Sequence, residues 1–147
     1  RFALTTLQAG NRGFFGLSDV TTAPTNVDPT TNTTPGKVGM AFNSNTGNWR
    51  FVWNVTGTAP SSYDLGASFP INTTDLYELV IFAKPNDTVI RYRITNLTTG
   101  AQTSSTTAAT NIPANTTYLA PVEWMTNNAT AVAVAFDLIG WYLESDN

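Results

Sequence analysis

Few residues of this chain could carry out chemistry, because its 147 residues include neither histidine nor cysteine. Histidine is the usual general base near neutral pH, and cysteine is the strongest common nucleophile. Together they also supply most ligands for zinc, copper and iron. Ten carboxylates, two lysines, five arginines and many hydroxyls remain. We therefore expect no catalytic residue, no bound metal and no cofactor, and interpret the chain as a binding or structural protein.

Glycoside hydrolysis is a reaction that carboxylates alone could support, and it needs two of them at a fixed separation. The three glutamates, Glu78, Glu123 and Glu144, lie far apart in the sequence. Only Glu144 has a carboxylate two residues away, in Asp146, and no alternating Glu-x-Asp-x-Glu string occurs. A hydrolase therefore stays an alternative only if distant strands bring carboxylates together.

A calcium site would need several clustered oxygen ligands. Asp19, Asp28 and the turn at 43–48 could contribute such oxygens, but no EF-hand or repeat pattern joins them. Calcium binding is thus a second alternative, without a motif to support it.

Seven Asn-x-Ser/Thr sequons make a secreted glycoprotein a further interpretation. They lie at Asn32, Asn54, Asn72, Asn86, Asn96, Asn115 and Asn128. A chain with 26 Thr and 15 Asn produces such triplets by chance, and Asn54 falls inside a tryptophan-rich strand. We favour the chance explanation.

Sugar binding suits this composition better than catalysis does, since sugars stack on aromatic rings and hydrogen-bond to amides and hydroxyls. The chain has four Trp and five Tyr. Trp49 and Trp53 fall on the apolar face of a strand and are expected in the core. The candidate ligand contacts are aromatic residues beside loops, nearby amides and two arginines suited to an anionic glycan: Tyr63, Trp124, Asn127, Asn128, Arg91 and Arg93. The alternatives are that the two aromatic residues anchor their loops and that the two arginines form surface ion pairs with acidic neighbours.

The spacing of apolar residues predicts an all-β fold, because it has a period of two nearly throughout. In the segment 48–55, the residues Trp49, Phe51 and Trp53 share one face, and the turn sequence NSNTG joins it to the segment 37–42. Turn residues between two alternating segments indicate a β-hairpin.

A second hairpin is predicted from the segments 76–83 and 88–95, which Pro85, Asn86 and Asp87 connect. The first of these segments is apolar on both faces, so we expect a central strand. A polar strand should follow at 100–107. The expected core residues are Trp49, Phe51, Trp53, Leu79, Ile81, Ile90, Tyr92, Val134 and Phe136.

The segment 130–145 is predicted to be one long strand. Its alanine-bearing face, where small residues permit close approach, is a candidate subunit interface: Ala131, Ala133, Ala135, Ile139, Trp141 and Leu143. Packing of this face on the second sheet of the same subunit is the alternative. The Thr-, Pro- and Asn-rich segments 21–36 and 56–69 are predicted to be long loops, where binding often resides.

Length and charge limit the classes of partner. We expect residues 1–147 to form one domain, of a common domain size. A net charge of −3 argues against nucleic acid, which needs clustered Lys and Arg. No apolar run approaches the ~20 residues that span a bilayer, so membrane insertion is not expected. The chain starts without Met and opens in a strand-like segment, which suggests a fragment of a longer protein.

The order of several segments resembles C-terminal domains of bacteriophage tail fibres and other virion appendage proteins. The resemblance covers nearly the whole chain. It is a resemblance of sequence pattern, and its motifs are of the kind that supports the fold. They are RGFFGL at 12–17, the glycine-containing strand and Trp-bearing strand at 38–49, LGASFP at 65–70, YELVIF at 77–82, RITNLTTG at 93–100 and WYLESD at 141–146.

This resemblance implies a concanavalin A-like or related antiparallel β-sandwich, or jelly roll, usually trimeric and displayed on a virion for host attachment. It supplies no catalytic residue. The expected function is thus non-enzymatic recognition of a host surface glycan by a homotrimer, with this chain as the C-terminal part of a fibre. The alternative is a purely structural virion module without a ligand, such as a head fibre, a capsid decoration or a trimerisation cap.

Overall fold

The computed structural model describes residues 1–22, 24–43 and 45–144, and within these ranges it contains ten β-strands and no helix. The strands are β1 (Phe2–Thr6), β2 (Arg12–Ser18), β3 (Lys37–Asn43), β4 (Arg50–Asn54), β5 (Ser61–Asp64), β6 (Leu76–Phe82), β7 (Arg91–Asn96), β8 (Gln102–Thr106), β9 (Ala120–Thr126) and β10 (Ala135–Leu138). All neighbouring strands pair antiparallel. The predicted all-β fold is confirmed.

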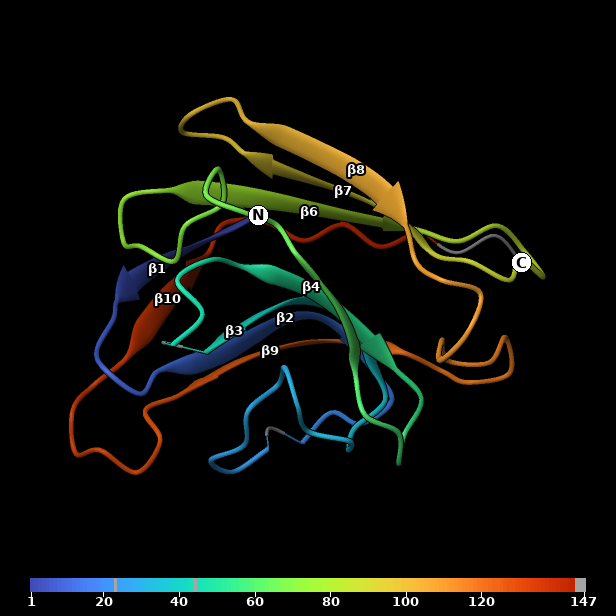
Figure 1. Ribbon diagram of the computed structural model, residues 1–147, viewed down its shortest axis with the longest axis horizontal. Coiled ribbons are helices and arrows are strands. Elements are labelled where there is room, and N and C mark those ends of the chain that lie inside the picture. Colours follow the sequence, from blue (N-terminus) through green and yellow to red (C-terminus); the bar gives the residue numbers. More distant parts are fainter. Residues whose placement is uncertain (23, 44, 145–147) are drawn as a thin grey trace.

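Two five-stranded sheets face each other as a β-sandwich (Figure 1). The first sheet has the order β10-β1-β6-β7-β8, and the second has the order β5-β4-β3-β2-β9. Accordingly β6 lies in the middle of the first sheet, as its apolar sequence predicts. Within the described ranges, no helix is long and apolar enough to cross a membrane.

Both predicted hairpins are present. In the first, β3 pairs with β4, and Met40 lies opposite Phe51. In the second, β6 pairs with β7, and Leu79 lies opposite Ile94. The predicted polar strand is β8, which pairs with β7 along its whole length. These predictions used turn residues and the alternation of apolar and polar residues. Both features act over short sequence distances, so they predict hairpins well.

The predicted long strand at 130–145 is wrong. Only Ala135–Leu138 forms a strand, β10, at the edge of the first sheet. Residues 139–144, hereafter the C-terminal segment, are described without regular structure, and Ser145 lies outside the described residues. The predicted loop at 56–69 is also corrected, since it contains β5, which pairs with β4. Residues 61–64 are mostly hydroxyl-bearing, so their alternation carries little hydrophobic contrast.

Aromatic rings fill the space between the sheets. Trp49 is fully buried and has its ring edge-on to those of Phe2, Phe15, Phe42 and Tyr77, at centroid distances of 4.8–5.6 Å. Such edge-to-face pairs add to the gain from burying apolar area. The centre of the core is thus a ring cluster contributed by both sheets.

Most of the predicted core residues are buried. Trp49, Phe51, Trp53, Ile90 and Tyr92 are at most 8% exposed. Leu79, Ile81 and Phe136 are half-buried and pack against this core. Val134 is half-buried outside the core cluster, because the segment that carries it is not part of a strand.

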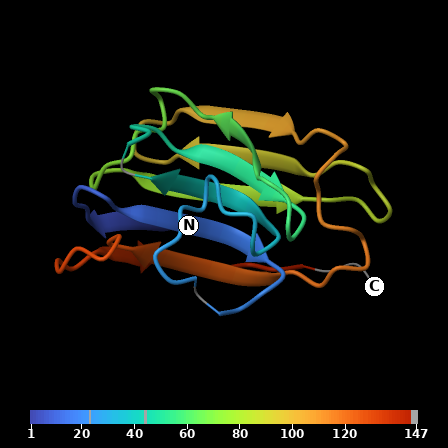
Figure 2. The same cartoon turned by 60° about the horizontal axis from the view of Figure 1, so that its bottom comes forward.

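A loop covers the outer face of the second sheet (Figure 2). This face carries its own buried cluster of Phe14, Ala41, Val52, Val122 and Trp124, against which Val27 of the loop packs. The predicted loop at 21–36 is thus present, and it serves as a second layer of packing.

Polar anchors hold this loop in place. The side-chain amide of Asn43 donates to Asp28 Oδ2 at 2.7 Å, and the amide of Asn54 donates to the carbonyls of Thr33 and Pro35. Among the described residues, no group of three or more acidic side chains that could hold a metal ion is found. Ser44 of the suggested turn lies outside the described ranges.

Lys37 lies buried beneath the same loop. Its Nζ donates to the carbonyl of Asn32 at 2.7 Å and to that of Pro35 at 3.3 Å. Burial lowers the pKa of this ammonium from 10.5 to about 8, and the negative charges of Asp19 and Asp28 oppose the shift. A buried lysine without a contacting carboxylate makes the stability of the protein depend on pH.

Candidate functional site

A groove lies between β6 and the C-terminal segment, beyond the end of β1 that carries Arg1. Its volume is about 670 Å³. In Figure 1 the C-terminal segment follows the second half of β6. The groove is mainly apolar and includes Leu17, Leu79, Ile81, Trp141 and Leu143 in its walls.

Hydrogen bonds at the inner end of the groove fix its walls. The amide of Ile139 donates to the carbonyl of Arg1 at 2.9 Å, and the α-amino group of Arg1 donates to the carbonyl of Gly140 at 2.9 Å. On the other side, the guanidinium of Arg1 contacts Glu78 at 2.8 Å. Arg1 therefore spans the distance between β6 and the C-terminal segment.

All three glutamates of the chain line this groove, although nothing in their sequence spacing indicates it. Distant strands thus gather the carboxylates, which is the condition set above for a hydrolase. Each carboxylate already has a partner: Glu78 is paired with Arg1 at 2.8 Å and Arg93 at 3.7 Å, and Glu144 accepts a hydrogen bond from Tyr142. Asp146, the other carboxylate considered with Glu144, lies outside the described residues.

Glu123 is the carboxyl group whose protonation burial favours. Burial raises its pKa, and the hydrogen bond that it accepts from Trp141 Nε1 at 2.7 Å opposes the shift. A carboxyl group with a raised pKa suits the general acid of an acid–base pair. The other half would be an uncommitted carboxylate, whereas Glu78 holds two ion pairs.

The candidate ligand contacts do not form one site. Arg91 is the first residue of β7 and lies opposite Phe82 of β6. Its guanidinium forms an ion pair with Asp87. Asn127 and Asn128 lie in the loop after β9. The side-chain amide of Asn127 donates to the backbone carbonyl of Val132 in the same loop. Figure 1 shows the β6–β7 loop and the β9–β10 loop at opposite ends of the sandwich.

Trp124 lies under the covering loop and is only 6% exposed, so its ring offers little surface to a ligand. It sits on β9 opposite Phe14 and belongs to the cluster on the outer face of the second sheet. The sequence places it before a loop, and it gives no indication that another loop packs on this face.

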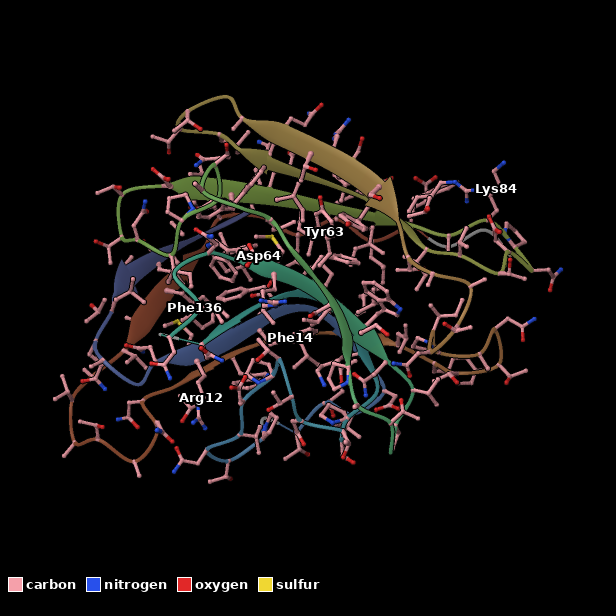
Figure 3. All side chains as sticks on the ribbon, in the orientation of Figure 1. Arg12, Phe14, Tyr63, Asp64, Lys84 and Phe136 are labelled. Carbon is pink, nitrogen blue, oxygen red and sulfur yellow. The ribbon has the colours of Figure 1, made fainter. Side chains whose placement is uncertain are left out.

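Tyr63 is the candidate aromatic residue that is open to solvent, with 52% of its surface exposed. It lies on β5, the edge strand of the second sheet, together with Asp64 (Figure 3). Arg50 donates to Ser62 at 3.1 Å and to Asp64 at 3.4 Å. Because side chains alternate along a strand, the ring of Tyr63 lies on the face of its partner Phe51, whereas Ser62, Asp64 and Arg50 lie on the opposite face of this edge.

The candidate interface residues are all exposed. Ile139, Trp141 and Leu143 are 56%, 41% and 62% exposed, and the three alanines are also exposed. Trp141 nevertheless contacts the second sheet of the same chain, because its Nε1 donates to Glu123 of β9. Near the candidate interface, Val80 and Phe82 on the outer face of β6 are exposed as well.

Comparison of this chain with protein-family models, with curated proteins and with solved structures gave no match.

Proposed function

We propose that this chain is a non-enzymatic attachment domain of a virion appendage, which assembles as a homotrimer and contacts a glycan on the host cell surface. The observation that carries the proposal is an apolar surface on the outside of the sandwich. It comprises residues that line one groove, each 37–81% exposed: Val80, Phe82, Ile139, Trp141, Tyr142 and Leu143. Large exposed apolar patches mark interaction surfaces.

Association of identical chains explains this surface and the low charge together. Only 12% of the residues are charged, about half of the usual share. Closed cyclic symmetry buries such a patch without leaving an open interface that would propagate. The trimer, rather than a dimer, comes from the resemblance to fibre-tip domains, which match a threefold shaft.

The glycan contact is proposed at the exposed edge of β5. The ring of Tyr63 offers an apolar face for a pyranose, and aromatic side chains with a polar tip suit surfaces that are part apolar and part wet. Arg50, Ser62 and Asp64 supply donors and acceptors on the opposite face of the same edge. These groups stand on paired strands, which position binding residues more rigidly than loops do.

A glycan array probed with the assembled protein and with Tyr63→Ala tests this part of the proposal. We expect the wild type to retain specific glycans and Tyr63→Ala to lose at least tenfold in affinity. Tyr118→Ala is the matched control, because Tyr118 is 95% exposed in a different segment. Equal binding by all three proteins would contradict a site at Tyr63.

The second candidate function is a structural virion module without a ligand. The burial of Trp124 favours it, since this leaves fewer exposed aromatic rings than the sequence suggests. Such a module would form the trimer and retain no glycan on the array. The two functions therefore differ in the array result and agree in the oligomeric state.

A further inference from the structure

The ring of Tyr63 belongs to the inner face of the second sheet. Tyr63 on β5 lies opposite Phe51 on β4, which is fully buried in the core between the sheets. Directly opposite residues of two paired strands place their side chains on the same face of the sheet. Because β5 is an edge strand, Tyr63 is nevertheless 52% exposed. The sandwich is therefore open along β5, with an aromatic ring at the opening.

The edge strand of the first sheet, β8, borders the same opening. Phe51 of β4 stacks on Tyr92 of β7, with 3.7 Å between the ring centroids. β3 and β6, which flank this stacked pair on one side, also contact each other, so β5 and β8 flank it on the other side. Ser105 of β8 lies opposite Tyr92 and thus on the inner face, and like Tyr63 it is exposed.

Three hydroxyl groups meet between these edges. Burial raises the pKa of the Tyr92 hydroxyl, a hydrogen bond with Ser105 opposes the shift, and Tyr63 adds to it. Such effects act over short distances, so they agree with the strand register in placing the three residues side by side. Tyr92 is only 4% exposed, which leaves the Tyr63 ring and the Ser105 hydroxyl as the accessible parts.

We infer that a neutral sugar unit binds between the two edges, with its apolar face on the Tyr63 ring and a hydroxyl group on Ser105. This inference rests on the proposed glycan binding, to which it adds a second contact residue and the charge of the ligand. A pyranose has an apolar face and several hydroxyl groups, so it matches a ring on one edge and a hydroxyl on the other. The two contact residues come from different sheets, so only the folded sandwich brings them together.

The absence of charge on the inner faces of the two described edge strands favours a neutral ligand. The inner-face residues of β5 and β8 are Ser61, Tyr63, Thr103 and Ser105. Arg50 pairs with Asp64 on the outer face, and Arg93 lies outward, opposite Ser104. A carboxylate or sulfate between the edges would therefore lose hydration without gaining a cation in exchange.

An array that carries neutral, sialylated, uronate-bearing and sulfated glycans tests the inference. We expect the wild type to retain neutral glycans, and a rise in salt from about 0.05 M to about 0.5 M to change binding less than about twofold, because salt screens only charged contacts. Ser105→Ala should weaken binding at least about fivefold, the effect of one lost hydrogen bond. Ser104→Ala is the matched control, because Ser104 is an exposed serine one position away on the outer face, and its loss should leave binding unchanged. Thermal unfolding verifies that each variant is folded.

Two results would overturn the inference and leave the proposed glycan binding in place. The first is equal binding by Ser104→Ala and Ser105→Ala while Tyr63→Ala loses binding, which would place the sugar away from β8. The second is retention of acidic glycans alone, with binding that falls as salt rises, which would place the ligand on the outward arginines. A wild type that retains no glycan would contradict the proposed glycan binding itself, and the inference with it.

Discussion

Replacement of Trp49 by alanine tests the ring cluster at the centre of the sandwich. Trp49 is 0% exposed and contacts four other rings. Removal of a buried Phe or Trp side chain costs about 3–5 kcal/mol, and each ring pair contributes about 0.5–1.5 kcal/mol beyond area burial. The cost of truncation already includes the ring pairs, and Trp49 has four of them, so we expect Trp49→Ala to lower the free energy of unfolding by about 5 kcal/mol, the upper end of that range.

Urea unfolding followed by circular dichroism measures this change, and Trp141→Ala is the matched control. Trp141 is 41% exposed and makes one hydrogen bond to Glu123. Its loss should cost about 1 kcal/mol, the usual net contribution of one hydrogen bond. Because a domain of this size has a free energy of unfolding of about 5–15 kcal/mol, Trp49→Phe provides a milder variant if Trp49→Ala does not fold. A cost below about 2 kcal/mol for Trp49→Ala, or equal costs for the two tryptophans, would refute the proposed core.

Three further predictions concern charge, backbone packing and chemistry. The free energy of unfolding should rise as the pH increases from 7 to 9.5. The reason is that lysine in the unfolded chain keeps its proton up to a pKa of about 10.5, while Lys37 in the folded protein loses it at a pKa of about 8. Urea titrations at several pH values should show a smaller dependence of the free energy of unfolding on pH for Lys37→Met. Gly39→Ala should cost more than about 2 kcal/mol in the same titration, because a Cβ there would lie 2.4 Å from the carbonyl oxygen of Phe15, whereas Gly140→Ala, with nothing within 4 Å, should be neutral within about 0.5 kcal/mol. Capsular polysaccharide should release no more reducing ends with the wild type than with Glu123→Gln, and an activity that this substitution removes would show an enzyme.

Local sequence determined which parts of the fold were predictable. The β3–β4 and β6–β7 hairpins combine alternation with turn residues, and both were predicted with their faces correct. β9 buries Val122 and Trp124 under the covering loop, and its other face mixes Glu123 with Pro121 and Met125, so its sequence lacks the clear alternation that marks a half-buried strand. The segment at 130–145 alternates in sequence, yet most of it finds no strand partner and stays exposed.

The groove depends on contacts that the sequence does not reveal. Arg1, Glu78 and Glu123 come from three different strands or strand ends, and the C-terminal segment joins them through backbone hydrogen bonds. Such long-range contacts arise from the topology of the sheets, and residue spacing along the chain carries no trace of them. The exposed edge at Tyr63 was predictable as a surface, since short polar segments seldom form the core.

Light scattering coupled to size-exclusion chromatography most directly tests the central claim, which is association through the candidate interface residues of the segment 131–143. We predict a mass of about 47 kDa at micromolar concentration, three times the 15.8 kDa of one chain. Ala133→Arg should shift this species to a folded monomer of 15.8 kDa, because Ala133 is exposed in the single chain. A wild-type mass of one chain, or a trimer that Ala133→Arg leaves intact, would contradict the account.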